Sequence, residues 1–282
     1  MAVIAMLSAK SAPGVTTSVA LLASQWPGPV VVADADPAGG DLAFGWLGSL
    51  AAAGRIQVDR GVLSFVHESR IRDGTTPSRI EPHLQRVPGG RDVDVLVGLA
   101  RRPAGARLVE TADWARLAGE LGDLGRPQPD GVDVLVDCGR YGPETPWPLL
   151  DRADLVLITM RAHRRYLFAA GALAATLRSR IEPQRLALAI CGSTPARARE
   201  SARVLGLPAE VELPHDLRTA RVFSDGASAP YVRRRPKLVR AAAAAADRLH
   251  QVLNHRRHAS ESETETGATS TRGVTVSGQR WS

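Results

Sequence analysis

The sequence predicts an α/β fold with a doubly wound, mostly parallel β-sheet and helices on both of its faces. Short apolar runs, each with the length of one buried strand, recur along the chain, and segments with helical spacing or polar loops separate them. Two of these runs end in an aspartate, Asp34 and Asp137. In an open α/β sheet, ligands bind at the carboxyl ends of the parallel strands, so both carboxylates are expected at that edge.

The size and composition of the chain fit one such domain. Its 282 residues are 44% hydrophobic, which is enough for a large core. We expect the domain to span residues 1–255 and residues 256–282 to form a disordered tail, because Ser, Thr, Glu and Gly dominate that tail. The formal net charge of +7 favours acidic partners such as nucleic acid or an anionic membrane face. A genome rich in G and C explains the same arginine and alanine content more simply.

The N-terminal residues and the cysteines bear on the compartment. The start of the sequence lacks the basic region of a signal peptide. No stretch approaches the roughly 20 uninterrupted apolar residues of a membrane span. Cys138 and Cys191 both lie in apolar, strand-like runs, so we expect reduced thiols and a cytoplasmic protein, with peripheral contact to membrane or nucleoid as an option.

The first strand, loop and helix form the arrangement of a phosphate-binding loop. An apolar strand is expected at 2–7, small residues follow at 10–17, and residues 18–24 keep helical spacing. The helix should begin near Thr16, so its free N–H groups and the positive end of its dipole would face the loop. An anion is favoured at such a site.

The loop reads K-S-A-P-G-V-T-T and resembles the deviant phosphate-binding loop of the MinD/ParA family, K-G-G-x-G-K-T-T. On this pattern Lys10 matches the signature lysine that reaches phosphate, and Thr16 is placed to ligate magnesium. The resemblance implies that the whole loop surrounds the phosphates: Lys10, Ser11, Ala12, Pro13, Gly14, Val15, Thr16 and Thr17. The loop departs from the pattern at Ser11 and Ala12, which replace glycines, and at Val15, which replaces the second lysine. Taken alone, it is equally compatible with a turn that binds no nucleotide.

A second strand, expected at 29–33, leads into an acidic segment. Residues 34–41 read D-A-D-P-A-G-G-D and are similar to the D-x-D-P-x-G-[GN]-x segment of the same family. The resemblance implies that Asp36 orients or activates the attacking water and that Asp34 supports the magnesium shell. The alternative is a turn whose aspartates cap a helix.

The strand expected at 133–137 reads D-V-L-V-D. An aspartate at such a strand end is suited to hold a magnesium-bound water, and the resemblance places Asp137 on the Walker B aspartate. An ordinary strand with a capping aspartate is the alternative. Residues 139–143 are expected to form a mobile loop, in which Arg140 is either a phosphate contact or, more simply, a solvated arginine.

The remaining elements follow from apolar periodicity. Further strands are expected at 93–99, 154–159 and 186–191, helices at 110–121, 166–180, 221–226 and 238–253, short helical pieces at 42–47 and 61–66, and a long connection at 70–90. Residues 211–216 resemble a late family segment, V-x-[IL]-P-x-D, which implies that Pro214 and Asp216 lie near the base. The asparagine that reads adenine in many relatives is absent at Gly192 and Ser193.

The resemblance implies a nucleotide-binding protein that uses ATP and Mg²⁺, forms a nucleotide-dependent homodimer, and acts in intracellular positioning, as in chromosome or plasmid partitioning, septum placement, or placement of secretion or pilus sites. Val15 leaves the phosphates without one positive charge, so ATP hydrolysis is expected to be weak or absent. Expected partners include an ATPase-activating or secretion protein.

Two alternatives remain from the sequence. One is a non-catalytic scaffold of a secretion or pilus apparatus, which keeps the fold for protein contacts. The other is non-specific DNA binding, or contact with an anionic membrane, through the basic run Arg233, Arg234 and Arg235. A solvated charged turn explains the same run without any partner.

Overall fold

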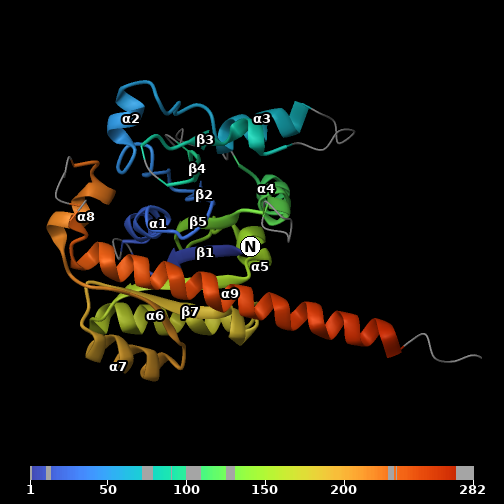
Figure 1. Ribbon diagram of the computed structural model, residues 1–282, viewed down its shortest axis with the longest axis vertical. Helices are drawn as coiled ribbons and strands as arrows, with labels where there is room; N and C mark the ends of the chain where they lie inside the picture. The colour runs from blue at the N-terminus through green and yellow to red at the C-terminus, as the bar shows by residue number, and fades with distance from the viewer. Residues whose placement is uncertain are drawn as a thin grey trace, which may run out of the picture.

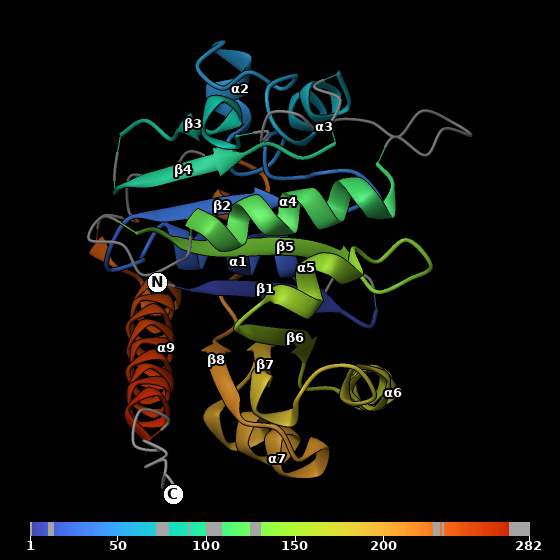
Figure 2. The ribbon, with the colours of Figure 1, turned by 90° about the vertical axis from the view of Figure 1, so that its right-hand side faces the viewer.

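The computed structural model describes residues 2–10, 14–71, 79–89, 91–99, 109–124, 131–227, 232 and 234–270, with side chains up to residue 255. Within these residues, eight strands form one sheet in the order β3-β4-β2-β5-β1-β6-β7-β8 (Figures 1 and 2). All neighbouring strands pair in parallel except β3, which is antiparallel to β4. The strands are β1 (Val3–Ser8), β2 (Val30–Asp34), β3 (Gln85–Arg86), β4 (Val93–Leu96), β5 (Asp133–Arg140), β6 (Leu155–Arg161), β7 (Leu186–Cys191) and β8 (Ala209–Leu213). The predicted doubly wound, mostly parallel sheet is confirmed.

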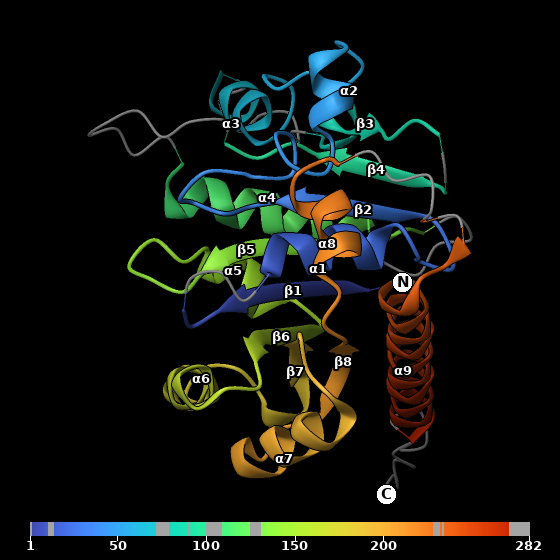
Figure 3. The ribbon, with the colours of Figure 1, turned by 90° about the vertical axis from the view of Figure 1, so that its left-hand side faces the viewer.

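Helices cover both faces of the sheet and enclose two apolar cores. The core on one face joins the sheet to α3, α4, α6 and α7, and the core on the other face joins it to α1, α8 and α9. Figures 2 and 3 show these two faces in turn, with α4 in front in one and α1 and α8 in front in the other. The helices are α1 (Val15–Ala23), α2 (Gly48–Ala52), α3 (Val62–Ile71), α4 (Thr111–Leu124), α5 (Trp147–Arg152), α6 (Arg164–Arg178), α7 (Pro195–Leu205), α8 (Leu217–Ser224) and α9 (Lys237–Ser270), with 3₁₀ turns η1 (Glu81–His83) and η2 (Pro183–Arg185).

The central strands are buried on both faces, which explains why their sequences are continuous apolar runs rather than alternating ones. Every residue of β1 and β2 is buried. The strand expected to end at Asp137 continues for three more residues, so the expected loop at 139–143 is wrong for its first two positions. The reason is continued pairing with β1, in which Ser8 is the register partner of Arg140 and the Tyr141 N–H donates to the Ser8 carbonyl at 2.8 Å.

The segment between β2 and β4 differs most from expectation. Residues 42–47 form turns, and the helix follows only at Gly48–Ala52. The connection expected at 70–90 contains η1 and the two-residue strand β3. Gln85 holds β3 in place, because its side-chain amide donates to the Gln57 and Arg60 carbonyls at 2.8 and 2.7 Å. A strand this short has no periodicity to read in a sequence.

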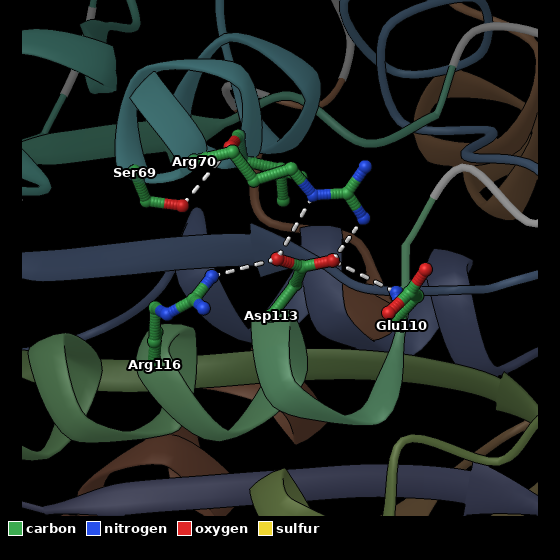
Figure 4. Close-up of polar contacts among 6 residues, drawn as sticks. Ser69, Arg70, Glu110, Asp113 and Arg116 are labelled. Carbon is green, nitrogen blue, oxygen red and sulfur yellow. Dashed lines mark hydrogen bonds and ion pairs between the residues drawn. The ribbon is translucent and has the colours of Figure 1, made fainter. Parts of the chain in front are cut away.

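A buried carboxylate joins α3 to α4. The Asp113 side chain accepts hydrogen bonds from the Arg70 guanidinium, from Arg116 Nη1 at 2.9 Å and from the Glu110 N–H at 2.9 Å (Figure 4). Burial alone would raise the pKa of Asp113, but the bonds from Arg70 and Glu110 and the charge of Arg116 outweigh it, so the pKa is lowered. The ion pair therefore fixes the start of α4 against the end of α3.

The last helix, α9, packs along the sheet and α1 through its alanine-rich half, as expected for residues 238–253. Its backbone continues to Ser270 (Figure 1). The expected division into a domain at 1–255 and a tail at 256–282 stays a prediction. In the described part of the chain no helix combines the length and apolarity needed to cross a membrane. Cys138 and Cys191 are both free thiols.

Candidate functional site

Two buried aspartates lie side by side at the carboxyl edge, the edge formed by the carboxyl ends of the parallel strands. Asp34 on β2 and Asp137 on β5 are register partners, and their side chains are shielded from solvent. Asp34 Oδ2 accepts a hydrogen bond from the Leu42 N–H at 3.2 Å, and Asp137 Oδ1 accepts one from the Gly139 N–H at 2.8 Å. Within the described residues, Asp34 Oδ1 and Asp137 Oδ2 are buried without a hydrogen bond of ordinary geometry.

This environment disfavours the charged form of both carboxyls. Burial, followed by the charge of Asp137, raises the pKa of Asp34 well above its ordinary value. Burial raises the pKa of Asp137 to about 6, and the charges of Asp36 and Asp41 add to the increase, while the Thr16 hydroxyl and the Gly139 N–H oppose it. These interactions place Thr16 and Asp36 in the immediate surroundings of Asp137. Three of the predicted site residues, Thr16, Asp36 and Asp137, therefore converge on one region.

Glycines make room for these carboxylates. A β-carbon at Gly98 would lie 2.6 Å from Asp34 Cγ, and one at Gly40 would lie 2.8 Å from the same atom. A β-carbon at Gly139 would overlap the Asp36 carboxylate, and Gly139 has φ +62°. Gly40 falls within the acidic motif that the sequence analysis quoted, but nothing in the sequence pointed to Gly98, whose role depends on a neighbouring strand.

The start of α1 lies at the same edge. Gly14 adopts the left-handed conformation (φ 100°, ψ 37°) immediately before the helix and makes no side-chain cap, and glycine adopts this conformation readily. The first-turn N–H groups have no partner within the helix and suit an anion. Lys10 is exposed, whereas Ser11, Ala12 and Pro13 lie outside the described residues.

The three residues that begin α1 are oriented differently. The Val15 side chain is 6% exposed and packs in the apolar core between α1 and the sheet, so this side chain contributes neither charge nor hydrogen bond to the site. Thr16 is partly exposed, and its hydroxyl opposes the rise in the pKa of Asp137. Thr17 is also partly exposed.

Asp36 occupies the turn after β2. Its Oδ1 accepts a hydrogen bond from the Ala38 N–H at 2.8 Å. This is the contact expected if Asp36 stabilises the turn, which is the alternative to a role with nucleotide. Burial raises the pKa of Asp36, and the negative charge of Asp41 raises it further. The hydrogen bond from the Ala38 N–H and the positive charge of Arg140 act in the opposite direction. Its second oxygen is not used in that turn contact.

The donor set fits magnesium better than a softer metal. The candidates are a hydroxyl, Thr16, and the carboxylates of Asp34 and Asp137, and oxygen ligands are those that Mg²⁺ prefers. The unpartnered Asp137 Oδ2 is the kind of atom that a cation or its water would satisfy. Among the described residues, no three His, Cys, Asp or Glu side chains are grouped to hold a metal by themselves. A magnesium ion here would therefore depend on water or ligand oxygens as well.

The base-binding segment follows β8. Asp216 caps α8, because its Oδ1 accepts from the Thr219 N–H at 3.0 Å and its Oδ2 from the Thr219 hydroxyl at 2.6 Å. This cap starts α8 at Leu217, four residues before the helix expected at 221–226. Pro214 is partly buried beside it. Contact of Pro214 and Asp216 with a base stays a prediction.

The basic run lies just before α9. Arg234 and Arg235 are exposed, and the Arg235 carbonyl accepts a hydrogen bond from Arg240 Nη1 at 2.8 Å. Arg233 lies outside the described residues. Contact of this run with DNA or a membrane stays a prediction.

The sheet order, the helix α1 that follows β1 and the acidic strand ends are consistent with an α/β fold of the P-loop NTPase type. MinD, a cell division protein of Aquifex aeolicus, shares this fold with a TM-score of 0.67 at 18% identity, over 89% of this chain and 98% of that chain. A ParA family ATPase from Chlorobium tepidum matches with a TM-score of 0.63 at 18% identity, over 87% and 98% of the two chains. MinD of Pyrococcus horikoshii, solved with Mg-ADP, matches with a TM-score of 0.63 at 14% identity, over 89% and 96%.

These similarities establish the fold and no more, because the identities are low. No protein-family model matches the sequence, and neither does any curated protein.

Proposed function

We propose that this protein binds ATP with Mg²⁺ at the carboxyl edge and hydrolyses it weakly or not at all. The observation that carries the proposal is the buried pair Asp34 and Asp137, each with one oxygen that lacks a hydrogen-bond partner among the described residues. Buried negative charge is costly unless it is paired with a cation. The adjacent start of α1 presents N–H groups to an anion. A metal ion held on a phosphate chain satisfies both requirements.

The proposed roles follow the chemistry of each side chain. The Thr16 hydroxyl would contact magnesium, and Asp34 and Asp137 would hold its waters. Asp36 would orient the attacking water, and Lys10 would contact phosphate. Magnesium, when bound, would neutralise part of the negative charge of the phosphates. The loop residues that we assign to the phosphates are Lys10, Ser11, Ala12, Pro13, Gly14, Val15, Thr16 and Thr17, and we assign Pro214 and Asp216 to the base.

Val15 supports the expectation of slow chemistry. Phosphoryl transfer depends on positioning and on stabilisation of the developing charge. Removal of one strong electrostatic contact from such a transition state costs about 3–4 kcal/mol, or two to three orders of magnitude in rate. Val15 faces the apolar core and makes no such contact.

The cellular role that we propose is intracellular positioning by a cytoplasmic, nucleotide-dependent homodimer. Structures with this fold include MinD in complex with MinC from Aquifex aeolicus and a plasmid partition protein from Borrelia burgdorferi bound to AMPPNP. By analogy of fold, we propose placement of chromosomes, plasmids, septa or secretion and pilus sites, with a partner protein that reads the nucleotide state.

Equilibrium dialysis of the full chain with labelled ATP tests nucleotide binding. We expect the protein to retain ATP only when Mg²⁺ is present. Without a cation, the buried carboxylates of Asp34 and Asp137 would repel the negatively charged phosphates. No retention at millimolar nucleotide would refute the proposal. Turnover at the rate of ATPases that keep the loop lysine would refute the impaired hydrolysis while leaving binding intact.

A non-catalytic scaffold is the second candidate, and the burial of Val15 favours it. The variant Val15→Lys discriminates between the two, provided that it folds, because the long, flexible lysine stem can carry an ammonium group from this core-facing position to the loop. Gained ATPase activity would support the nucleotide site. Correctly folded Val15→Lys protein that neither binds nor hydrolyses ATP would support the scaffold.

A further inference from the structure

We propose that Arg140 is a phosphate-binding residue that supplies, from the end of β5, the positive charge that Val15 does not supply. The inference rests on the proposed nucleotide site. It names the side chain whose positive charge offsets the negative charge of the bound phosphates. Three features of the described structure support it: the place of Arg140 at the carboxyl edge, the packing of the preceding residue Gly139 against the Asp36 carboxylate, and the lack of an ion pair between Arg140 and any described carboxylate.

The strand register fixes the place of Arg140. It follows Asp137 by three residues on β5 and is the register partner of Ser8, the last residue of β1. Two residues after Ser8, Lys10 begins the phosphate loop. Arg140 therefore lies between the magnesium ligand proposed on β5 and the entrance of the loop.

The backbone before Arg140 touches the acidic side of the site. Gly139 packs against the Asp36 carboxylate so closely that a β-carbon would overlap it. The Ser8 hydroxyl donates to the Gly139 carbonyl at 3.4 Å and joins this segment to β1.

Arg140 is exposed, and no carboxylate of the described chain forms an ion pair with it. Two other arginines near the ends of elements are engaged: Arg180 pairs with Asp151, and Arg185 donates to the Ala153 carbonyl at 2.9 Å. An exposed arginine at this edge that forms no ion pair within the described residues is available to a ligand. Its planar guanidinium can form two parallel hydrogen bonds to a phosphate.

The competing explanation is a solvated arginine that only balances the charge of Asp36. The two explanations differ in what the loss of Arg140 does to nucleotide affinity. We would titrate a fluorescent ATP analogue with Mg²⁺ into the full wild-type chain and into Arg140→Ala and Arg140→Lys. Arg199→Ala is the matched control, because Arg199 is an exposed arginine on α7 and its removal changes the net charge equally.

We expect Arg140→Ala to weaken binding by about 10- to 100-fold, the range for loss of a charge-assisted hydrogen bond. Arg140→Lys should recover part of the affinity, and Arg199→Ala should stay within about twofold of wild type. Because Arg140 is exposed, melting temperatures without nucleotide should agree, which excludes loss of the fold as the cause.

The outcomes separate the inference from the proposed function. Equal affinity of wild type and Arg140→Ala would overturn the inference and leave nucleotide binding established. Equal weakening by Arg140→Ala and Arg199→Ala would also overturn it, because the effect would then be one of net charge. Absence of binding by the wild type would refute the proposed function, and the inference with it.

Discussion

Asp34 and Asp137 are register partners on adjacent parallel strands, and both carboxyls are buried. Two carboxylates so placed repel each other and lose their hydration. The folded chain therefore carries an electrostatic cost at neutral pH, concentrated at the edge where an α/β sheet binds its ligands. This relationship gives the site a measurable signature even before a ligand is added.

The variant Asp137→Asn should be more stable than wild type at neutral pH. Burial raises the pKa of Asp137 to about 6, so the folded state retains a proton that the unfolded state releases near pH 4. Stability should fall as the pH rises through this window, by up to about 3 kcal/mol above pH 6. Asparagine keeps the acceptor for the Gly139 N–H and removes the charge.

Urea denaturation from pH 4 to pH 8 measures this effect. The gain in Asp137→Asn should be about 1–3 kcal/mol at pH 7.5 and should vanish near pH 4, where wild type is protonated. Mg²⁺ should stabilise wild type more than the variant. A variant that is less stable than wild type at pH 7.5 would show that the charge of Asp137 is already compensated.

The variant Gly139→Ala should destabilise the fold at the centre of the site. Its β-carbon would overlap the Asp36 carboxylate, and the backbone has φ +62°, which together cost about 1–3 kcal/mol. Gly142→Ala is the matched control, since a β-carbon there has no heavy atom within 4 Å, and it should change stability by less than about 0.5 kcal/mol. Similar melting temperatures for the two variants would contradict the packing described here.

The variant Asp113→Asn tests the link between α3 and α4. Arg70 and Arg116 would lose their charged acceptor, so the free energy of unfolding at pH 7 should fall by about 2 kcal/mol. Because the pKa of Asp113 is lowered, its contribution is present above the ordinary pKa of about 4 and is lost as the pH falls further. The difference from wild type should therefore shrink in acid.

Denaturation of Glu200→Gln alongside provides the control, because Glu200 is an exposed acid on α7 and its removal should have little effect. A difference between Asp113→Asn and wild type that stays constant from pH 7 down to pH 2 would mean that shape, not charge, holds the two helices together.

The sequence predicted the sheet because parallel central strands are buried on both faces and read as continuous apolar runs. β7 was placed at its observed bounds, Leu186–Cys191. β3 was missed because a two-residue strand has no pattern and depends on Gln85 bonding to a distant loop. The end of β5 was missed because Gly139 and Arg140 look like loop residues and stay in the strand only through pairing with Ser8.

The candidate site was predictable to the extent that its residues fall into local motifs. Thr16, Asp36 and Asp137 were selected because their segments resemble motifs of the MinD/ParA family, and the structure brings them into one electrostatic neighbourhood. Gly98 was not predictable, because its packing on Asp34 arises from the pairing of β4 with β2. Their chemical roles remain predictions until nucleotide binding is measured.

The variant His250→Ala should loosen α9 without unfolding the sheet. Asp133, at the start of β5, accepts hydrogen bonds from the Ala2 N–H at 2.5 Å and from Trp26 Nε1 at 2.9 Å, and His250 Nδ1 lies 2.9 Å from its Oδ2. This contact ties α9 to the amino end of the sheet.

Loss of the His250 contact should lower stability by about 1 kcal/mol and raise amide exchange in α9 more than in β1 or β5. His255→Ala is the control, because His255 is exposed on the same helix. Identical exchange in the two variants would mean that the apolar face alone, through Leu249 and its neighbours, holds α9 in place.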